Sequence, residues 1–229
     1  MEFLLLIGDA AGEPPRADVG VEDMGKFARE LADLGVLKSA AGPLRPVAEG
    51  ARIRVDGGAP IVTDGPFAEA REVVGGYFVV EAADRAAAIE LAKRCPYTRA
   101  GRVLVRGTQY WRRSEPTVGA QFLLLYLRPP VEDGPDEPRI RAMIAHTDEL
   151  ERRNVHLEGA RLPPEPPAAR VESRGGRTLV TDGPFAESKE ILGGYALIQA
   201  PGRTAAIEIA AQIPHARWGA IELREVGRR

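Results

Sequence analysis

The sequence has few of the features that mark a secreted, membrane-spanning or nucleic-acid-binding protein. Its 229 residues include one cysteine, Cys95, so an internal disulfide is excluded. No apolar run approaches the roughly 20 residues that span a bilayer. The first apolar run, at 3–7, is short and follows no basic residue, unlike a secretory signal. The formal net charge of −2 gives no basic excess for nucleic acid. We therefore expect a cytoplasmic protein that binds neither membrane nor nucleic acid.

Motifs for metals, nucleotides and covalent catalysis are also missing. There is no His-Glu-x-x-His, no Cys-x-x-Cys and no EF-hand spacing of carboxylates, so we expect no dedicated metal site. Neither a G-x-G-x-x-G nor a Walker loop occurs, and no G-x-S-x-G elbow is present. We accordingly expect no cofactor.

An internal repeat dominates what the sequence does contain. Residues 63–69 recur as 181–187, 118 residues later, and 11 of the 15 positions in the window 63–77 are identical. The register continues to the end of each copy, and the first apolar runs align with one further residue of offset. A repeat of this length predicts tandem modules, because each copy is long enough to form its own core. The predicted units are module 1 at 1–107, a connector at 108–119 and module 2 at 120–229.

Each module shows the pattern of a ferredoxin-like α+β fold. In copy one the pattern predicts a strand at 3–7, a helix around 24–31, a strand pair within 51–62, a strand at 73–81, a helix at 85–94 and a strand at 102–106. This β-α-β-β-α-β order gives one antiparallel sheet with both helices on one face. The open sheet faces then need covering. We expect the two modules to pack sheet to sheet as an intrachain dimeric α+β barrel, although the connector is also long enough for exchange within a homodimer.

The repeated motif resembles a known family. The string Val-Thr-Asp-Gly-Pro-Phe-Ala-Glu, at 62–69 and 180–187, is followed by a basic residue and Glu, two aliphatics and Gly-Gly-Tyr. Each copy also closes with a short strand that ends in an arginine, Arg106 or Arg224. Together these features resemble the DGPF branch of the YCII-related family. The resemblance implies a fold similar to the dimeric α+β barrels and a biochemical function that is mostly unassigned. It also implies small-molecule chemistry in a few relatives, including chloride elimination from a chlorinated aromatic, and a link to extracytoplasmic-function sigma factors.

The motif loop has a structural and a functional interpretation. Asp64, Gly65 and Pro66 can form a rigid turn that directs Phe67 into the core. Alternatively, some of its carboxylates face the space between the sheets, where burial raises a carboxyl pKa and creates a general acid or base. Adjacent residues of a strand point to opposite faces, so at most a subset can face inward. The candidate binding residues are Asp64, Glu69, Glu72 and Tyr77 in copy one, and Glu187, Lys189, Glu190 and Tyr195 in copy two.

Histidine distinguishes the two copies, because all three histidines lie in copy two. The resemblance implies a catalytic base in the first helix of a module, and His146 occupies that helix. We therefore predict a catalytic pair of His146 and Asp182, with copy one completing the pocket. We assign no catalytic role to His156, and we interpret His215 as a loop residue.

Two classes of function remain open from the sequence. One is a cofactor-free acid–base enzyme of lyase or isomerase type, in which Tyr195 and Lys189 position an anionic or phenolic small molecule. The other is a non-catalytic module that binds a ligand or a regulatory protein such as a sigma factor. The first predicts that the side chains of His146 and Asp182 converge, and the second predicts that they do not.

Overall fold

A computed structural model describes residues 1–10, 18–67, 72–114, 119–129, 137–164, 167–183 and 190–227. The first repeat forms β1 (Glu2–Ala10), α1 (Val21–Asp33), β2 (Leu37–Ala41), η1 (Val47–Glu49), β3 (Ala51–Asp56), β4 (Ala59–Asp64), β5 (Glu72–Glu81), α2 (Arg85–Lys93), η2 (Pro96–Arg99) and β6 (Arg102–Gly107). After β7 (Gln109–Arg113), the second repeat forms β8 (Ala120–Arg128), α3 (Glu137–Arg152), β9 (His156–Arg161), β10 (Ala169–Arg174), β11 (Arg177–Asp182), β12 (Ile191–Ala200), α4 (Arg203–Gln212), η3 (Pro214–Arg217) and β13 (Ala220–Glu225).

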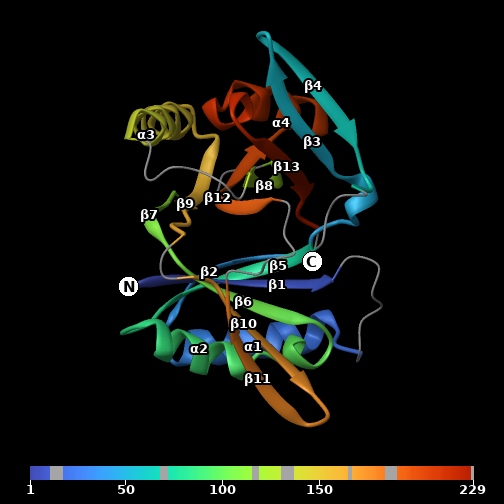
Figure 1. Cartoon of the computed structure of the whole chain (residues 1–229), viewed down its shortest axis with the longest axis vertical. Helices are drawn as coiled ribbons and strands as arrows, with labels where there is room; N and C mark the ends of the chain where they lie inside the picture. The colour runs from blue at the N-terminus through green and yellow to red at the C-terminus, as the bar shows by residue number, and fades with distance from the viewer. Residues whose placement is uncertain are drawn as a thin grey trace.

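The chain folds into two sheets that lie face to face, each covered by two helices on its outer side (Figure 1). The six-stranded sheet has the order β11-β10-β6-β1-β5-β2, and the seven-stranded sheet has the order β4-β3-β13-β8-β12-β9-β7. Within them, β6-β1-β5-β2 and β13-β8-β12-β9 are equivalent four-stranded arrays with antiparallel neighbours. The α+β class and the two tandem ferredoxin-like modules are therefore confirmed.

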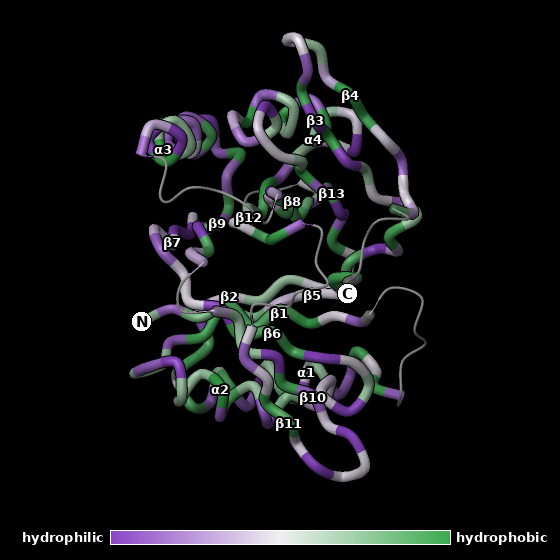
Figure 2. The backbone as a smooth tube through the Cα atoms, in the orientation of Figure 1, coloured by the Kyte–Doolittle hydropathy of each residue, from purple (hydrophilic) through white to green (hydrophobic). Residues whose placement is uncertain are grey.

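Three apolar cores follow from this layering. One lies between α1, α2 and the six-stranded sheet and includes Phe27 and Leu31. The second lies between α3, α4 and the seven-stranded sheet. The third lies between the sheets, where Leu4 and Val79 meet Leu123 and other residues of the second repeat. Hydropathy colouring shows apolar residues along the central strands and hydrophilic ones at the tip of the β10–β11 hairpin (Figure 2).

The predicted strands and helices of copy one coincide with β1, α1, the β3–β4 pair, β5, α2 and β6. Cys95 is buried. The sequence interpretation missed β2 and its equivalent β9, because Lys38, Ser39 and Glu158 interrupt the apolar pattern there. It also placed 108–119 in a connector, whereas β7 in that segment pairs with β9 as an edge strand.

The repeats exchange their β-hairpins, which the sequence did not reveal. The β3–β4 hairpin of the first repeat joins the seven-stranded sheet, where Ile53 pairs with Ile221. The β10–β11 hairpin of the second repeat joins the six-stranded sheet, where Val171 pairs with Val103. Each sheet is thus completed by a segment of the other repeat.

The repeated motif fastens these exchanged hairpins. Arg203 at the start of α4 donates to the carboxylate of Asp64, and Arg85 at the start of α2 donates to that of Asp182. The Gly65 amide donates to the carbonyl of Gly50 at 3.1 Å. A Cβ added to Gly65 would lie 2.0 Å from the carbonyl oxygen of Val47, so this close approach requires glycine. The conserved chemistry of the two motif copies therefore joins each repeat to the other.

Candidate functional site

Glu158 is a carboxylate buried between the two sheets. It lies in β9 and is 1% exposed. The Tyr195 hydroxyl of β12 donates to its Oε1 at 2.7 Å. Burial, and then the negative charge of Glu158, raise the pKa of the Tyr195 hydroxyl well above its ordinary value. Tyr195 therefore stays protonated and serves as a donor to the carboxylate.

Tyr77 brings the first repeat into the same cluster. Its ring lies 5.1 Å from that of Tyr195, measured between centroids. Burial and the charge of Glu158 raise the pKa of the Tyr77 hydroxyl well above its ordinary value. Glu158 and Ser39 lie near this buried hydroxyl, but it makes no well-formed hydrogen bond to either. Buried polar groups are rarely left unsatisfied, so the Tyr77 hydroxyl is available to donate a hydrogen bond to a further acceptor.

The edge strand β7 borders this cluster. Trp111 packs against the core between the sheets, and its buried Nε1 lies near the Tyr195 hydroxyl without a well-formed hydrogen bond. Arg113 pairs with Glu158 across β7 and β9, and its guanidinium donates to the carbonyl of Lys38 in β2. The cluster thus lies where the edges of the two sheets meet.

Glu158 has no acidic counterpart in the first repeat. Glu158 pairs with Leu197, and the residue that pairs with the equivalent Val79 is Ser39. Ser39 is also buried, at 7% exposure. The two repeats therefore supply one carboxylate, one serine and two tyrosines to the cluster, which we call the Glu158 site (Ser39, Tyr77, Trp111, Glu158 and Tyr195).

The structure does not bring His146 and Asp182 together. His146 lies in α3, beyond the seven-stranded sheet, whereas Asp182 ends β11 in the six-stranded sheet (Figure 1). Burial and then the charge of Arg153 lower the pKa of His146, and its buried Nε2 lacks a partner. Asp182 is 62% exposed and pairs with Arg85. The physical reason is the hairpin exchange, which carries Asp182 to the other sheet.

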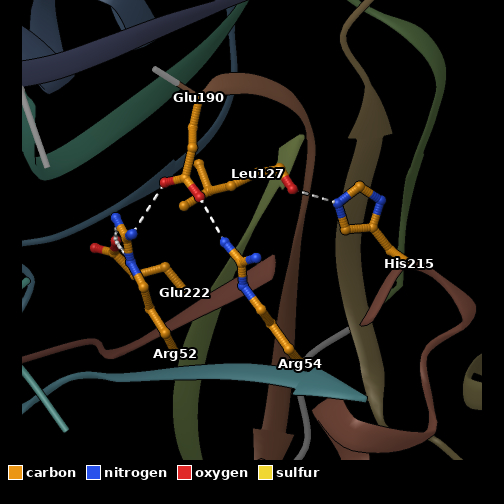
Figure 3. Close-up of polar contacts among 6 residues, drawn as sticks. All are labelled: Arg52, Arg54, Leu127, Glu190, His215 and Glu222. Atoms are coloured by element: carbon orange, nitrogen blue, oxygen red, sulfur yellow. Dashed lines mark hydrogen bonds and ion pairs between the residues drawn. The ribbon is translucent and has the colours of Figure 1, made fainter. Parts of the chain in front are cut away.

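The remaining predicted binding residues are dispersed. Tyr77 and Tyr195 lie in the Glu158 site, while Asp64 is exposed in its ion pair with Arg203. Glu190 bridges Arg52 at 2.9 Å and Arg54 at 3.0 Å (Figure 3). Glu69, Glu187 and Lys189 lie outside the described residues, as does the side chain of Glu72.

Arg52 links this ion-pair network to the motif. It also donates to Glu222 of β13 at 3.2 Å, and its guanidinium carbon lies 4.5 Å from the centre of the Phe67 ring. Phe67 is half-buried beneath that guanidinium. These contacts attach the motif loop of the first repeat to the sheet of the second, so they support the structural interpretation of the loop.

The other two histidines are buried. Burial and then Arg112 lower the pKa of His156 to about 4, so it is neutral at pH 7. His215 lies in η3, where Nε2 donates to the carbonyl of Leu127 at 2.9 Å and Nδ1 accepts from Trp218 at 3.2 Å. Both nitrogens of His215 are thereby engaged, which indicates a structural role in place of the expected loop residue.

Comparison with known proteins decides the family. The YCII-related domain matches residues 1–112 and again 122–228. The chain belongs to the YCII-related family. An uncharacterised protein of Rhizobium meliloti (strain 1021), R00369, is 40% identical over 67 residues, which cover 28% of this chain and 54% of that protein. This YCII-related chain thus spans about half the length of the relative that it matches.

One solved structure is similar in outline to this YCII-related protein. It is titled a putative chlorite dismutase, TA0507, and the match covers 99% of this chain and 94% of that chain at 10% identity. The TM-score is 0.35, too low to inform ligand or activity. Among the described residues of this YCII-related protein, no three His, Cys, Asp or Glu side chains gather as metal ligands. None of its described helices is long and apolar enough to cross a membrane.

Sequence reasoning missed Glu158 and Trp111 as site residues. Glu158 belongs to β9, a strand that the apolar pattern did not predict. A usable signal was present, because a glutamate followed by Gly159-Ala160 departs from the serine at the equivalent place in copy one. Trp111 was assigned to the connector, so its burial against the inter-sheet core was not foreseen.

Proposed function

We propose that this YCII-related protein binds a small organic molecule between its two sheets, where Glu158 acts as the acid–base group. The observation that carries this proposal is a buried carboxylate, Glu158, that accepts from Tyr195 in a cluster with two further buried donors, Tyr77 Oη and Trp111 Nε1, neither of which makes a well-formed hydrogen bond. A ligand with a carbonyl, phenolic or carboxylate oxygen would satisfy both donors.

The chemistry of the site suits proton transfer. A carboxylate held in place beside a bound carbon or hydroxyl acid can take its proton as a general base. Tyrosine hydroxyls that point to a nearby oxygen stabilise the negative charge that develops there. Elimination and isomerisation need no more than these steps, so the proposal keeps the lyase or isomerase class and assigns the base to Glu158.

Deuterium exchange tests this proposal directly. Carbonyl and phenolic candidates would be screened by NMR for binding and then for exchange of their acidic C–H in D₂O. We expect Glu158→Gln to bind with similar affinity and to lose exchange by at least about 100-fold, in line with removal of a general base. Asp182→Asn is the matched control, because that exposed carboxylate lies outside the site. Exchange that survives in Glu158→Gln would reject the role of Glu158.

A second candidate function is protein binding by the exchanged hairpins. The edge strands β4 and β11 carry equivalent pairs of exposed aliphatic side chains: Ile61 52%, Val62 43%, Leu179 44% and Val180 42%. Exposed edges of this kind accept an added strand from a partner. A Leu179→Lys variant that loses a partner captured by the wild type, with Glu158→Gln retaining it, would favour this function over the first.

A further inference from the structure

Two buried arginines occupy equivalent places in the two repeats. Arg106 is the last but one residue of β6 and Arg224 that of β13, and they are 9% and 2% exposed. Arg224 donates through Nε to the carbonyl of Arg45 at 3.0 Å. Arg106 donates through Nη2 to the carbonyl of Pro163 at 2.9 Å, and Pro163 is the residue equivalent to Arg45. Both side chains therefore tie a last strand to the same loop of the opposite repeat.

Their charge balance differs. Arg224 lies 3.6 Å from Glu222, which also binds Arg52 (Figure 3). In the first repeat, Leu104 takes the place of Glu222, as the pairing of Leu104 with Arg170 and of Glu222 with Arg52 shows. Across the described part of the chain, Arg106 forms no ion pair, and its other bonds go to the carbonyls of Leu162 and Leu192. Its buried Nε has no partner.

A second substitution makes this side of the molecule more positive. Arg128 at the end of β8 pairs with Ile191, and its equivalent in β1 is Asp9, which pairs with Val73. Burial and then the charge of Arg128 lower the pKa of Arg106 to about 10. Leu104, Arg106 and Arg128 are thus two cations and a leucine, whereas the equivalent residues Glu222, Arg224 and Asp9 are one cation and two carboxylates.

We propose that Arg106 and Arg128 form a binding site for a small oxyanion, a carboxylate or phosphate group, at the start of β12. A buried guanidinium without a counter-charge is costly, and a bound anion removes that cost. Guanidinium groups match planar or tetrahedral oxyanions with paired donors. Arg128 is half-buried and lies over Gly193, where an added Cβ would be 3.2 Å from its Nε, and the preceding residue, Leu192, accepts a hydrogen bond from Arg106. The hydrogen bonds of Arg106 go to Leu162, Pro163 and Leu192, none of which belongs to the Glu158 site, so either proposal can fail alone.

Leu104→Glu offers a sharp test, because it supplies the carboxylate that the other repeat already has. Binding of inorganic phosphate and of acetate would be measured by calorimetry at constant ionic strength. The wild type should bind at least one of the two probes, and the preferred probe identifies the anion class. Leu104→Glu and Arg106→Gln should each weaken binding at least tenfold.

Arg224→Gln is the matched control, since its buried guanidinium already has Glu222 nearby. It should leave anion binding unchanged. If Leu104→Glu fails to fold, the comparison of Arg106→Gln with Arg224→Gln still decides the question. Absence of binding to the wild type, or equal binding in the wild type, Leu104→Glu and Arg106→Gln, would overturn the proposal. The Glu158→Gln variant should bind the anion normally, which separates this result from the proposed function.

Discussion

At the scale of single residues, the two tyrosines of the Glu158 site have unequal roles. Tyr195 donates to the buried carboxylate, whereas the hydroxyl of Tyr77 has no partner. Removal of a donor from a buried charge leaves that charge unsatisfied, but removal of an unpaired hydroxyl leaves nothing unsatisfied.

We therefore expect Tyr195→Phe to lower the free energy of unfolding by about 2 kcal/mol and Tyr77→Phe to change it by less than about 0.5 kcal/mol. Urea unfolding at pH 7 would measure both. Equal losses in the two variants would show that Tyr77 also holds the carboxylate.

His156 gives the structure a specific pH dependence. Its pKa is about 4 in the folded protein and about 6.5 when unfolded, so the unfolded chain binds more protons between these values. Stability should then fall as pH drops from about 6.5 to about 4, by roughly 3 kcal/mol in total from this group. Above pH 6.5 the contribution is constant.

Unfolding measured from pH 4 to pH 7.5 checks this expectation. His156→Asn should flatten the slope in that window, and the NMR signal of His156 should not titrate above pH 5 in the wild type. A slope that persists in the variant would assign the pH dependence to other groups.

The residue scale also shows how far the sequence predicted the site. Tyr77 and Tyr195 were identified because each ends a copy of the repeated motif. Glu158 was not identified from the sequence. It joins the site only through the pairing of β9 with β12, and the apolar pattern did not predict β9. The predicted pair of His146 and Asp182 required both residues to lie in the same module. The sequence carries no signal that β11, which ends in Asp182, crosses to the other sheet.

At the scale of elements, most strands and helices followed from hydrophobic period and turn residues. Gly57 and Gly58, both with positive φ, form the predicted turn between β3 and β4. What the periodicity could not give was the neighbour of that hairpin. The alternation of polar Arg52 and apolar Ile53 would suit pairing with either β6 or β13. Which of these strands β3 joins therefore depends on contacts with distant residues such as Glu222.

Gly65 is the element-scale position most sensitive to substitution. Gly65→Ala would place Cβ 2.0 Å from the Val47 carbonyl oxygen and should cost about 2–3 kcal/mol of stability. Gly25→Ala is the matched control, because it lies inside α1 with only the end of the Arg29 side chain near, at 3.8 Å. It should gain about 0.5–1 kcal/mol. Thermal unfolding of both variants would measure these changes. An unchanged stability of Gly65→Ala would mean that the motif loop can shift to accommodate the added Cβ.

At the scale of the whole molecule, the hairpin exchange predicts that neither repeat is complete alone. A chain of residues 1–114 would lack the hairpin that covers β6, and a chain of 119–229 would lack the one that covers β13. Mixed together, the two chains should reassemble into a heterodimer with one cooperative unfolding transition.

Analytical ultracentrifugation of the separate and mixed halves would test this. The half 1–114 should self-associate more weakly than the half 119–229. In a homodimer of the first half Arg52 would meet Leu104, whereas in a homodimer of the second half Arg170 would meet Glu222. Two stable monomers would contradict the exchange.

Because the two repeats belong to one polypeptide, equivalent positions in them can hold different residues, which is impossible in a symmetric homodimer. In a homodimer, every residue at the axis occurs twice, so a glutamate at the Glu158 position would set two carboxylates against the same pair of tyrosines. Like charges at such a distance repel, and one of them would remain protonated. The fused chain instead has Ser39 at the position equivalent to Glu158, and Leu104 at the position equivalent to Glu222. Duplication within one gene thus allowed each half to specialise while the other preserved the shared architecture.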